Sequence, residues 1–118
     1  MKTSDTEVNQ MILTGKAMEA FEKHYAENVE MVENFEPPCL GKEKNRAREL
    51  EFFGKIGEFH GAELLASAYD DAKNTGFSEW MWDLTFKGGP RIQMKQVAVR
   101  RWANGKVVHE RFYYKPAM

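Results

Sequence analysis

Cysteine is almost absent from this chain of 118 residues, because Cys39 is its single thiol. One thiol cannot close an intramolecular disulfide, and it is too few for a zinc site built from several cysteines. The composition therefore indicates a reducing environment, and we expect a cytoplasmic protein.

Long hydrophobic runs are missing as well. The apolar run at Met11, Ile12 and Leu13 is much shorter than the hydrophobic segment of a signal peptide. Nowhere do the roughly 18 consecutive apolar residues of a membrane-spanning helix occur. We therefore expect neither an export signal nor a membrane partner.

Charge of one sign is not in excess, since 17 Lys and Arg residues stand against 18 Asp and Glu residues and the formal net charge is −1. The chain thus lacks a net positive field that would collect phosphate groups. Arg100 and Arg101 beside Trp102 resemble a platform for single-stranded nucleic acid, but the many acidic residues oppose this interpretation. We expect no nucleic-acid partner.

Familiar catalytic and cofactor motifs are also missing. The sequence has no G-x-S-x-G, P-loop or G-x-G-x-x-G segment. His24, His60 and His109 lie far apart, without the spacing of a metal site. His60 is expected instead at a helix C-terminus, where the helix dipole favours it. We therefore expect no metal and no cofactor.

What the chain does contain is typical of a single globular domain over residues 1–118, with 42% hydrophobic and 30% charged residues. Apolar residues at helical spacing predict helices over residues 6–25 and 41–56, the first in spite of the weakening effect of Gly15. A short strand is expected at residues 29–35, before a proline-rich loop.

Strand character dominates the second half of the chain. Three or four long strands are expected there, near residues 62–69, 77–86, 92–102 and 107–114. Asn104 and Gly105 form the strongest hairpin signal in the sequence. The order of elements predicts an α+β domain whose helices gather on one face of an antiparallel sheet.

One face of the predicted sheet is rich in aromatic residues. Because alternate residues of a strand share a face, this face carries Trp80, Trp82, Leu84 and Phe86, then Ile92, Met94, Gln96, Ala98, Arg100 and Trp102, then Val108, Glu110, Phe112 and Tyr114. Gln96 and Glu110 interrupt an otherwise apolar surface. Each of them needs a hydrogen-bond partner or a ligand there, since an unpaired buried polar group costs roughly 1 to 3 kcal/mol.

The opposite face of the sheet mixes apolar and polar residues. It carries Met81, Val97, Val99 and Tyr113 among Gln93, Lys95, Arg101 and Arg111. A patch of this composition favours a protein partner over bare water. We therefore expect a homodimer.

Several segments form a pattern that covers nearly the whole chain: a helix ending at residues 25–31, a short strand before a proline-rich loop, Gly41 before a second helix, and the closing segment 105–114. This pattern resembles the SnoaL-like branch of the NTF2-like superfamily. Residues 83–89, followed by Gln93 and Met94, also resemble small bacterial SnoaL-like proteins of unassigned function.

The resemblance implies an NTF2-like cone, in which a curved antiparallel sheet wraps around the N-terminal helices and leaves an internal pocket. It also implies a homodimer that pairs through its sheets. Members of the superfamily include ketosteroid isomerases, polyketide cyclases, dehydratases and many domains without chemistry.

Glu33 is placed by this resemblance at the position of the catalytic carboxylate in ketosteroid isomerases. Such a carboxylate moves a proton on a carbon beside a carbonyl, because burial raises its pKa toward the working pH. The alternative is a surface acid at a strand edge. The isomerases also use a tyrosine from the middle of the first helix to stabilise the oxyanion, and this chain has none there.

Three other residues are candidates for the missing polar group, namely Glu110, Gln96 and Tyr25. Glu110 has a structural alternative, an ion pair with Arg100 or Arg111 and no reaction attached. His109 is a weak partner for Glu110, because strand alternation places it on the opposite face.

We therefore expect a pocket that binds a small, largely apolar or ring-shaped molecule. The residues expected to contact it are Tyr25, Trp80, Trp82, Gln96, Phe112 and Tyr114. That the aromatic residues simply fill the core is the competing interpretation. The alternative function is a cofactor-free acid/base enzyme, an isomerase, cyclase or dehydratase, with Glu33 or Glu110 as the catalytic carboxylate.

Overall fold

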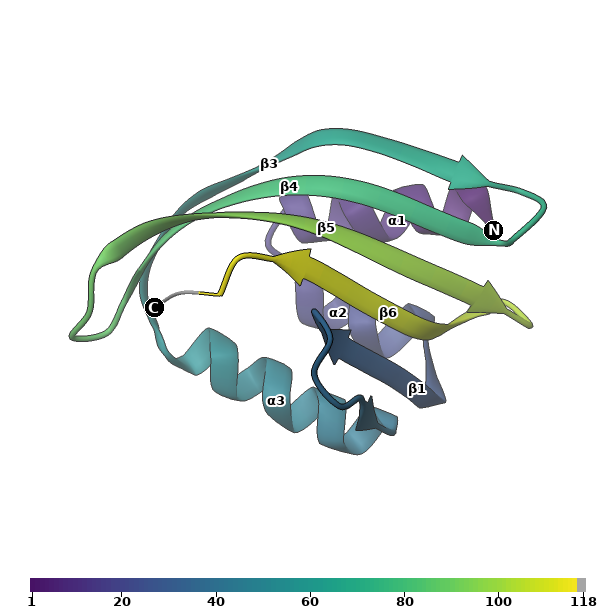
Figure 1. The fold of residues 1–118 in the computed structure, drawn as a ribbon, viewed down its shortest axis with the longest axis horizontal. Helices are drawn as coiled ribbons and strands as arrows, with labels where there is room; N and C mark the ends of the chain where they lie inside the picture. Colours follow the sequence, from purple (N-terminus) through teal and green to yellow (C-terminus); the bar gives the residue numbers. More distant parts are fainter. Residues whose placement is uncertain (117–118) are drawn as a thin grey trace.

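The computed structural model describes residues 1–116, so the last two residues of the predicted domain, 117 and 118, lie outside the described residues. Helices and strands follow one another along the chain (Figure 1). In order they are α1 (Lys2–Leu13), α2 (Ala17–His24), β1 (Tyr25–Glu33), β2 (Cys39–Leu40), α3 (Lys42–Gly54), β3 (Ile56–Asp70), β4 (Thr75–Phe86), β5 (Arg91–Ala103) and β6 (Lys106–Tyr114).

The strands form one curved, unclosed sheet with the order β2-β1-β6-β5-β4-β3. The neighbours from β3 to β6 are antiparallel, as are β1 and β2. β1 and β6 are parallel, so the predicted antiparallel sheet is wrong at this pair. The connection between them passes through α3 and four further strands, and a long crossover of this kind lets two neighbouring strands run in the same direction.

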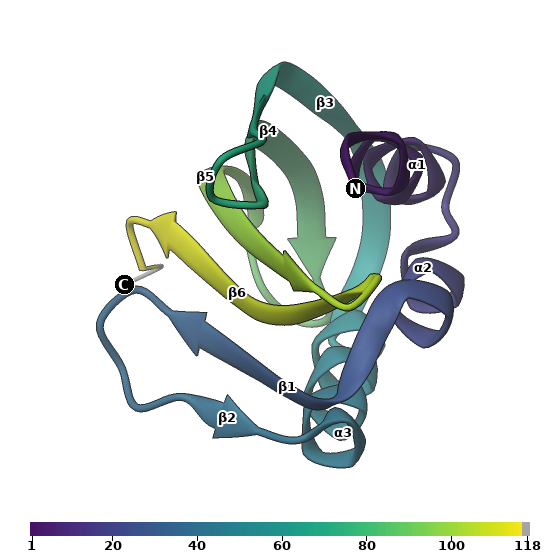
Figure 2. The ribbon, with the colours of Figure 1, turned by 90° about the vertical axis from the view of Figure 1, so that its right-hand side faces the viewer.

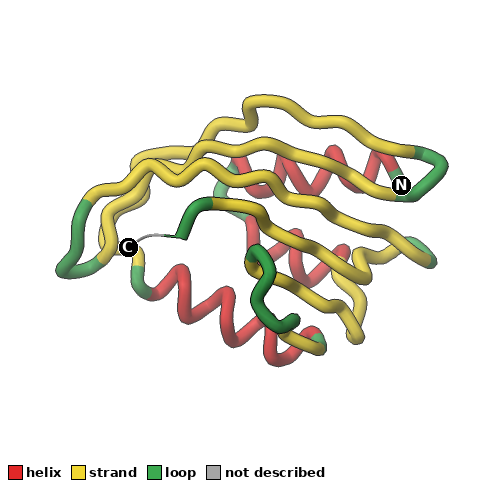
Figure 3. The backbone as a smooth tube through the Cα atoms, viewed as in Figure 1, coloured by secondary structure: helices red, strands yellow, loops and turns green. Residues whose placement is uncertain are grey.

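The helices lie on the concave side of the sheet (Figure 2). α1 packs against α2 and β3, while α3 packs against β1. The long strands β3, β4 and β5 curve along their length, which gives the sheet its hollow (Figure 3). The predicted α+β class, with a curved sheet around the helices, is confirmed.

The predicted single helix over residues 6–25 is wrong, because the segment forms two helices. α1 ends at Leu13, α2 begins at Ala17, and Gly15 between them has a φ of 79°. A residue without a Cβ adopts this left-handed conformation without steric cost, so Gly15 ends α1 rather than merely weakening a longer helix. The second helix stops one residue before Tyr25, which starts β1.

The first strand of the meander is longer than predicted. β3 starts at Ile56 instead of residue 62, and its pairing with β4 shifts register three times. His60 therefore lies inside β3, where its Nε2 is 2.8 Å from the Thr85 hydroxyl oxygen. The predicted position of His60 at a helix C-terminus is wrong, because α3 ends at Gly54.

The aromatic-rich inner face of the sheet is confirmed by the strand register. Residues directly opposite one another share a face, and the pairs include Trp80 with Gln96, Ala98 with Phe112, and Arg100 with Glu110. The register shifts between Arg101 and Trp102, and Trp102 pairs with Val107. This bulge puts buried Val107, rather than the predicted Val108, on the inner side.

The hydrophobic core lies where α1 and α2 meet the sheet. Its buried members are Val8, Ala20, Phe21, Tyr25, Val29, Met31, Trp102 and Val107. Among the described residues, no helix is both long enough and apolar enough to cross a membrane.

Candidate functional site

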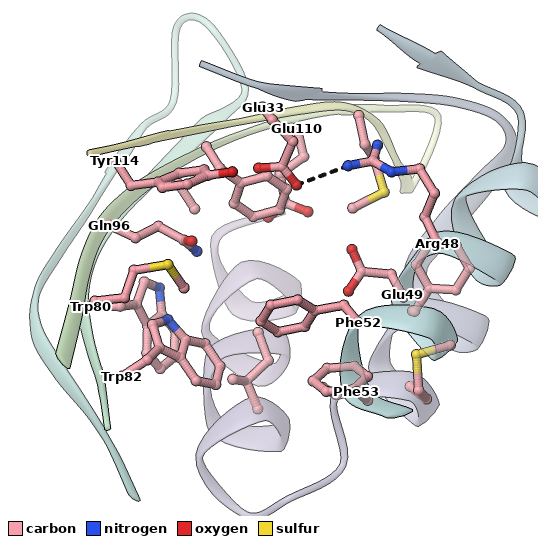
Figure 4. Close-up of a pocket in the computed structure, with 18 of the residues that line it drawn as sticks. Glu33, Arg48, Glu49, Phe52, Phe53, Trp80, Trp82, Gln96, Glu110 and Tyr114 are labelled. Atoms are coloured by element: carbon pink, nitrogen blue, oxygen red, sulfur yellow. Dashed lines mark hydrogen bonds and ion pairs between the residues drawn. The ribbon is translucent and has the colours of Figure 1, made fainter. Parts of the chain in front are cut away.

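A cavity of about 560 Å³ lies between the concave face of the sheet and the helices. All of the residues predicted for the site line it, namely Tyr25, Glu33, Trp80, Trp82, Gln96, Glu110, Phe112 and Tyr114. Helix α3 contributes Glu49, Phe52 and Phe53 from the other side (Figure 4). The structure thus brings together residues from β1, α3, β4, β5 and β6.

Aromatic rings form one end of the cavity. Trp80 and Trp82 stack with their ring centroids 5.6 Å apart and 28° between their planes. Phe52 meets Phe86 edge-on, with 6.0 Å between the ring centroids. The indole N–H of Trp80 donates to Ser78, whereas the indole nitrogen of Trp82 is buried without a hydrogen-bond partner among the described residues. This end is therefore apolar, with one free donor.

Glu33 lies at the rim of the cavity, at the end of β1. Its side chain is 32% exposed and accepts a hydrogen bond from Arg48 at 3.0 Å. Arg48 comes from α3 and is itself exposed. The two interpretations of Glu33 meet here, because it is a partly exposed acid at a strand end that also lines the pocket.

Glu110 is fully enclosed, with 1% of its surface exposed. Arg100, equally buried, donates from its Nε to one carboxylate oxygen at 3.0 Å, and the hydroxyl of Tyr25 donates to the other. Burial and the Glu110 carboxylate raise the pKa of Tyr25 well above its ordinary value, so Tyr25 stays protonated as the donor. The structure shows the ion pair with Arg100, while Arg111 donates to the backbone carbonyl of Asn34 instead.

The same buried network extends to residues of α1. The sequence analysis did not predict these contacts. Arg100 also donates from Nη1 to Asp5 and Asn9, at 3.1 Å each, and the Trp102 indole donates to Asp5 at 2.9 Å. Asp5 approaches β4 so closely that a Cβ on Gly76 would overlap its carboxylate. The spacing of Asp5 and Asn9, one helical turn apart, was the signal that both face the sheet.

Glu49 on α3 is the cavity residue that the sequence analysis missed. Burial, followed by the negative charges of Glu110 and Glu33, raises its pKa to about 7. Leu50, the residue after Glu49, is exposed on the outer side of the helix. The face that meets the cavity carries residues 49, 52 and 53. Their helical spacing was the available signal, hidden because its first member is an acid.

Tyr114 and Gln96 line the cavity next to each other, because they pair directly across β5 and β6. Burial and the nearby Glu33 carboxylate raise the pKa of Tyr114 to about 12. Tyr114 therefore presents a neutral hydroxyl to the cavity at ordinary pH.

Metal ligation has no support in the geometry. Among residues 1–116, no group of three His, Cys, Asp or Glu side chains is arranged to hold a metal ion. The polar groups of the lining include carboxyl, amide, hydroxyl, guanidinium and ammonium groups around an apolar space.

A comparison with protein-family models shows which family this chain belongs to. The SnoaL-like domain model matches residues 4–114. The chain belongs to the SnoaL-like family. The resemblance read from the sequence is thereby confirmed, and the concave sheet with its pocket is the NTF2-like architecture of that family. No curated protein sequence matches this SnoaL-like chain.

Solved structures share this fold. A Mesorhizobium loti protein, provisionally named a SnoaL-like polyketide cyclase, is 25% identical, with a TM-score of 0.83 over 96% of this chain and 97% of that chain. A Bacillus subtilis protein, provisionally named an isomerase, is 16% identical, with a TM-score of 0.78 over 97% and 85%. A Catenulispora acidiphila protein with a ketosteroid isomerase-like fold, in complex with trimethylamine, is 14% identical, with a TM-score of 0.72 over 89% and 80%.

Proposed function

We propose that this SnoaL-like protein binds a small, largely apolar molecule in its cavity. The observation that carries the proposal is the cavity itself, about 560 Å³ in volume and walled by the aromatic residues of β4, β6 and α3. Ligand pockets in proteins have volumes of about 300 to 1,000 Å³ and combine apolar walls with a few polar groups. Gln96 and Tyr114 supply such groups here.

The contacts of the two carboxylates predicted to be catalytic support a binding function more than an enzymatic one. Glu110 is held by Arg100 and Tyr25, and Glu33 by Arg48. In both cases an arginine already occupies a carboxylate oxygen that a substrate would need to reach. The geometry of these two residues therefore supports a binding pocket more directly than a reaction.

The binding proposal is tested with tert-butylbenzene, whose nine-proton singlet is followed by ligand-observed NMR. The wild-type protein should broaden this singlet in a saturable way. Met94→Trp should weaken the effect, because Met94 lines the cavity and the larger indole takes up part of its volume. Lys95→Trp is the matched control, since Lys95 is exposed on the opposite face of the same strand. Unchanged binding by Met94→Trp would refute the proposal, and so would a wild-type protein that binds neither this probe nor its cationic analogue trimethylphenylammonium.

A second candidate function is cofactor-free acid/base catalysis, and Glu49 is the observation that favours it. This carboxyl lines the cavity without a hydrogen bond or ion pair to the described residues, and its pKa of about 7 suits proton transfer at neutral pH. It would move a proton on a carbon next to a carbonyl, as in an isomerisation, cyclisation or dehydration.

The acid/base candidate is tested with 1-indanone in D₂O. Exchange of its α-protons, followed by NMR, should be accelerated by the wild-type protein and lost in Glu49→Gln. Glu33→Gln should retain the acceleration within a few-fold, since the Glu33 carboxylate already accepts a hydrogen bond from Arg48 at the rim. Exchange at the buffer rate with the wild-type protein would remove this candidate and leave the binding function untouched.

We also propose that two copies pair through the outer face of the sheet, in the cytoplasm. Val97 and Tyr113 lie opposite each other there on β5 and β6, and they are 37% and 39% exposed. Phe35 is exposed next to Tyr113, with 6.0 Å between the ring centroids. A cluster of exposed apolar side chains on a sheet face supports a partner, and a second copy is the simplest one.

A further inference from the structure

We infer that the molecule bound in the cavity carries a positively charged nitrogen, held beside Glu49, on an otherwise apolar body. This inference rests on the proposed binding function and adds the charge and orientation of the ligand.

The cavity lining carries one more carboxyl group than its cations can pair. The observed pairs are Arg48 with Glu33 at 3.0 Å, Lys55 with Glu51 at 3.4 Å, and Arg100 with Glu110 at 3.0 Å. Glu49 lines the same cavity and has no ion pair or hydrogen bond among the described residues. It is therefore the acid that remains for a ligand cation.

The electrostatic potential around Glu49 is negative. Glu110 and Glu33 both raise the pKa of Glu49, and the opposing effect of Arg48 is smaller than either. The surroundings therefore disfavour one more negative charge, and the same field attracts a positive one. The position next to Glu49 therefore favours a cationic group over an anionic one.

Aromatic rings lie where an organic cation needs them. Glu49 projects from α3 into the cavity, Phe52 follows it by one helical turn, and Trp80 and Trp82 lie across the cavity (Figure 4). Cations bind over aromatic faces, best over tryptophan, and the attraction strengthens when water is excluded. An ammonium group at Glu49 would thus leave its apolar substituents against Phe52 and the two tryptophans.

This arrangement couples ligand binding to a proton. Without a cation, burial favours the protonated Glu49, and a bound ammonium group favours its carboxylate. The proton released on binding leaves to solvent. The affinity for a cation should therefore rise as the pH rises through about 7.

Other titratable or charged groups line the same cavity as Glu49. They are Tyr25 and Glu33 of β1, Arg100 of β5, Glu110 and Tyr114 of β6, and Arg48, Glu51 and Lys55 of α3 and its C-terminal end. A pH dependence belongs to Glu49 only if Glu49→Gln removes it.

The test compares trimethylphenylammonium with tert-butylbenzene, which have the same shape and differ in one charge. Each has a nine-proton singlet that reports binding by NMR, and neither titrates. The wild-type protein should bind the cation at least tenfold more tightly at pH 8. Glu49→Gln should weaken the cation at least tenfold and leave tert-butylbenzene within twofold. Glu43→Gln is the matched control, because Glu43 is exposed on the same helix outside the cavity and should change neither affinity.

The pH arm should show a roughly tenfold gain in cation affinity from pH 6 to pH 8 in the wild type, and no gain in Glu49→Gln. Equal or tighter binding of tert-butylbenzene would overturn the inference and leave the binding function standing. Retention of the cation preference by Glu49→Gln would overturn it as well. If neither probe bound the wild type, the proposed function itself would fail, and this inference with it.

Discussion

Individual acidic residues in this pocket differ in what surrounds them, and the difference sets their contribution to stability. Glu110 is enclosed between Arg100 and Tyr25, whereas Glu33 is a partly exposed partner of Arg48. Glu110→Gln breaks a buried ion pair by removing one of the two carboxylates that contact Arg100, which typically costs about 3 kcal/mol. We expect the melting temperature to fall by more than about 10 °C, since 1 kcal/mol corresponds to about 4 °C in a domain of this size.

Glu33→Gln serves as the internal comparison. It should lower the melting temperature only slightly, because exposed ion pairs contribute at most about 1 kcal/mol to the free energy of unfolding. Thermal unfolding followed by circular dichroism measures both variants. If Glu110→Gln melted at the wild-type temperature, the buried network would not have the structural role assigned to it here.

A second prediction at the scale of single residues concerns the pH dependence of folding stability in the absence of a ligand. The folded protein holds the pKa of Glu49 at about 7, above its ordinary value of 4.5, so the folded state binds more protons than the unfolded state between these values. Folding stability is favoured below pH 4.5 and decreases as the pH rises through 7. Glu49→Gln removes this penalty, so it should match the wild type near pH 5 and be more stable by about 1 to 3 kcal/mol at pH 8.

Urea unfolding at the two pH values measures this difference. Other groups titrate in both proteins, and they cancel in the comparison as long as the substitution leaves their surroundings intact. A constant difference between the two proteins at pH 5 and pH 8 would mean that Glu49 keeps an ordinary pKa.

At the scale of the elements, the break between α1 and α2 is set by one glycine. Gly15 has a φ of 79°, and a Cβ there would meet no atom within 4 Å, so a side chain costs conformational energy without any clash. Gly15→Ala should destabilise the protein by about 1 kcal/mol, the cost of a left-handed conformation for a residue with a Cβ. Gly54→Ala is the control, since Gly54 ends α3 in open space without a positive φ.

Urea unfolding should place Gly54→Ala at or slightly above the wild type, because alanine lowers the entropy of the unfolded chain. A Gly15→Ala variant as stable as Gly54→Ala would show that the link between the helices does not require the left-handed conformation. The break matters for the site, because α2 ends directly before Tyr25, whose hydroxyl reaches Glu110.

At the scale of the whole molecule, the outer face of the sheet predicts the oligomeric state. Sedimentation at micromolar concentration should show a dimer for the wild type. Val97→Glu should shift it to monomer, because the substitution places a charge in the middle of the apolar patch. Leu50→Glu makes the same chemical change at an exposed site on α3, on the other side of the molecule, and should leave the dimer intact. A wild-type protein that sediments as a monomer would contradict the prediction.

The sequence by itself determined which residues of the meander share a face. A strand turns successive side chains to opposite faces, so Trp80, Trp82, Gln96 and Glu110 were placed together without coordinates. The Asn104-Gly105 turn fixed the pairing of the last two strands for the same kind of local reason. Both inferences depend on backbone geometry within a few residues, and the structure confirms them.

Only the tertiary structure decided what each polar side chain of the pocket faces. The pairing of Glu110 with Arg100 was one of two alternatives, and Asp5 joined them from α1 at the other end of the chain. Glu49 entered the cavity because α3 packs against β1, a contact that no periodicity encodes. Helix breaks and bulges change which residue faces the cavity. The protonation of a side chain there depends on neighbours that are distant in sequence. Local patterns therefore specified the faces, while long-range packing specified the chemistry.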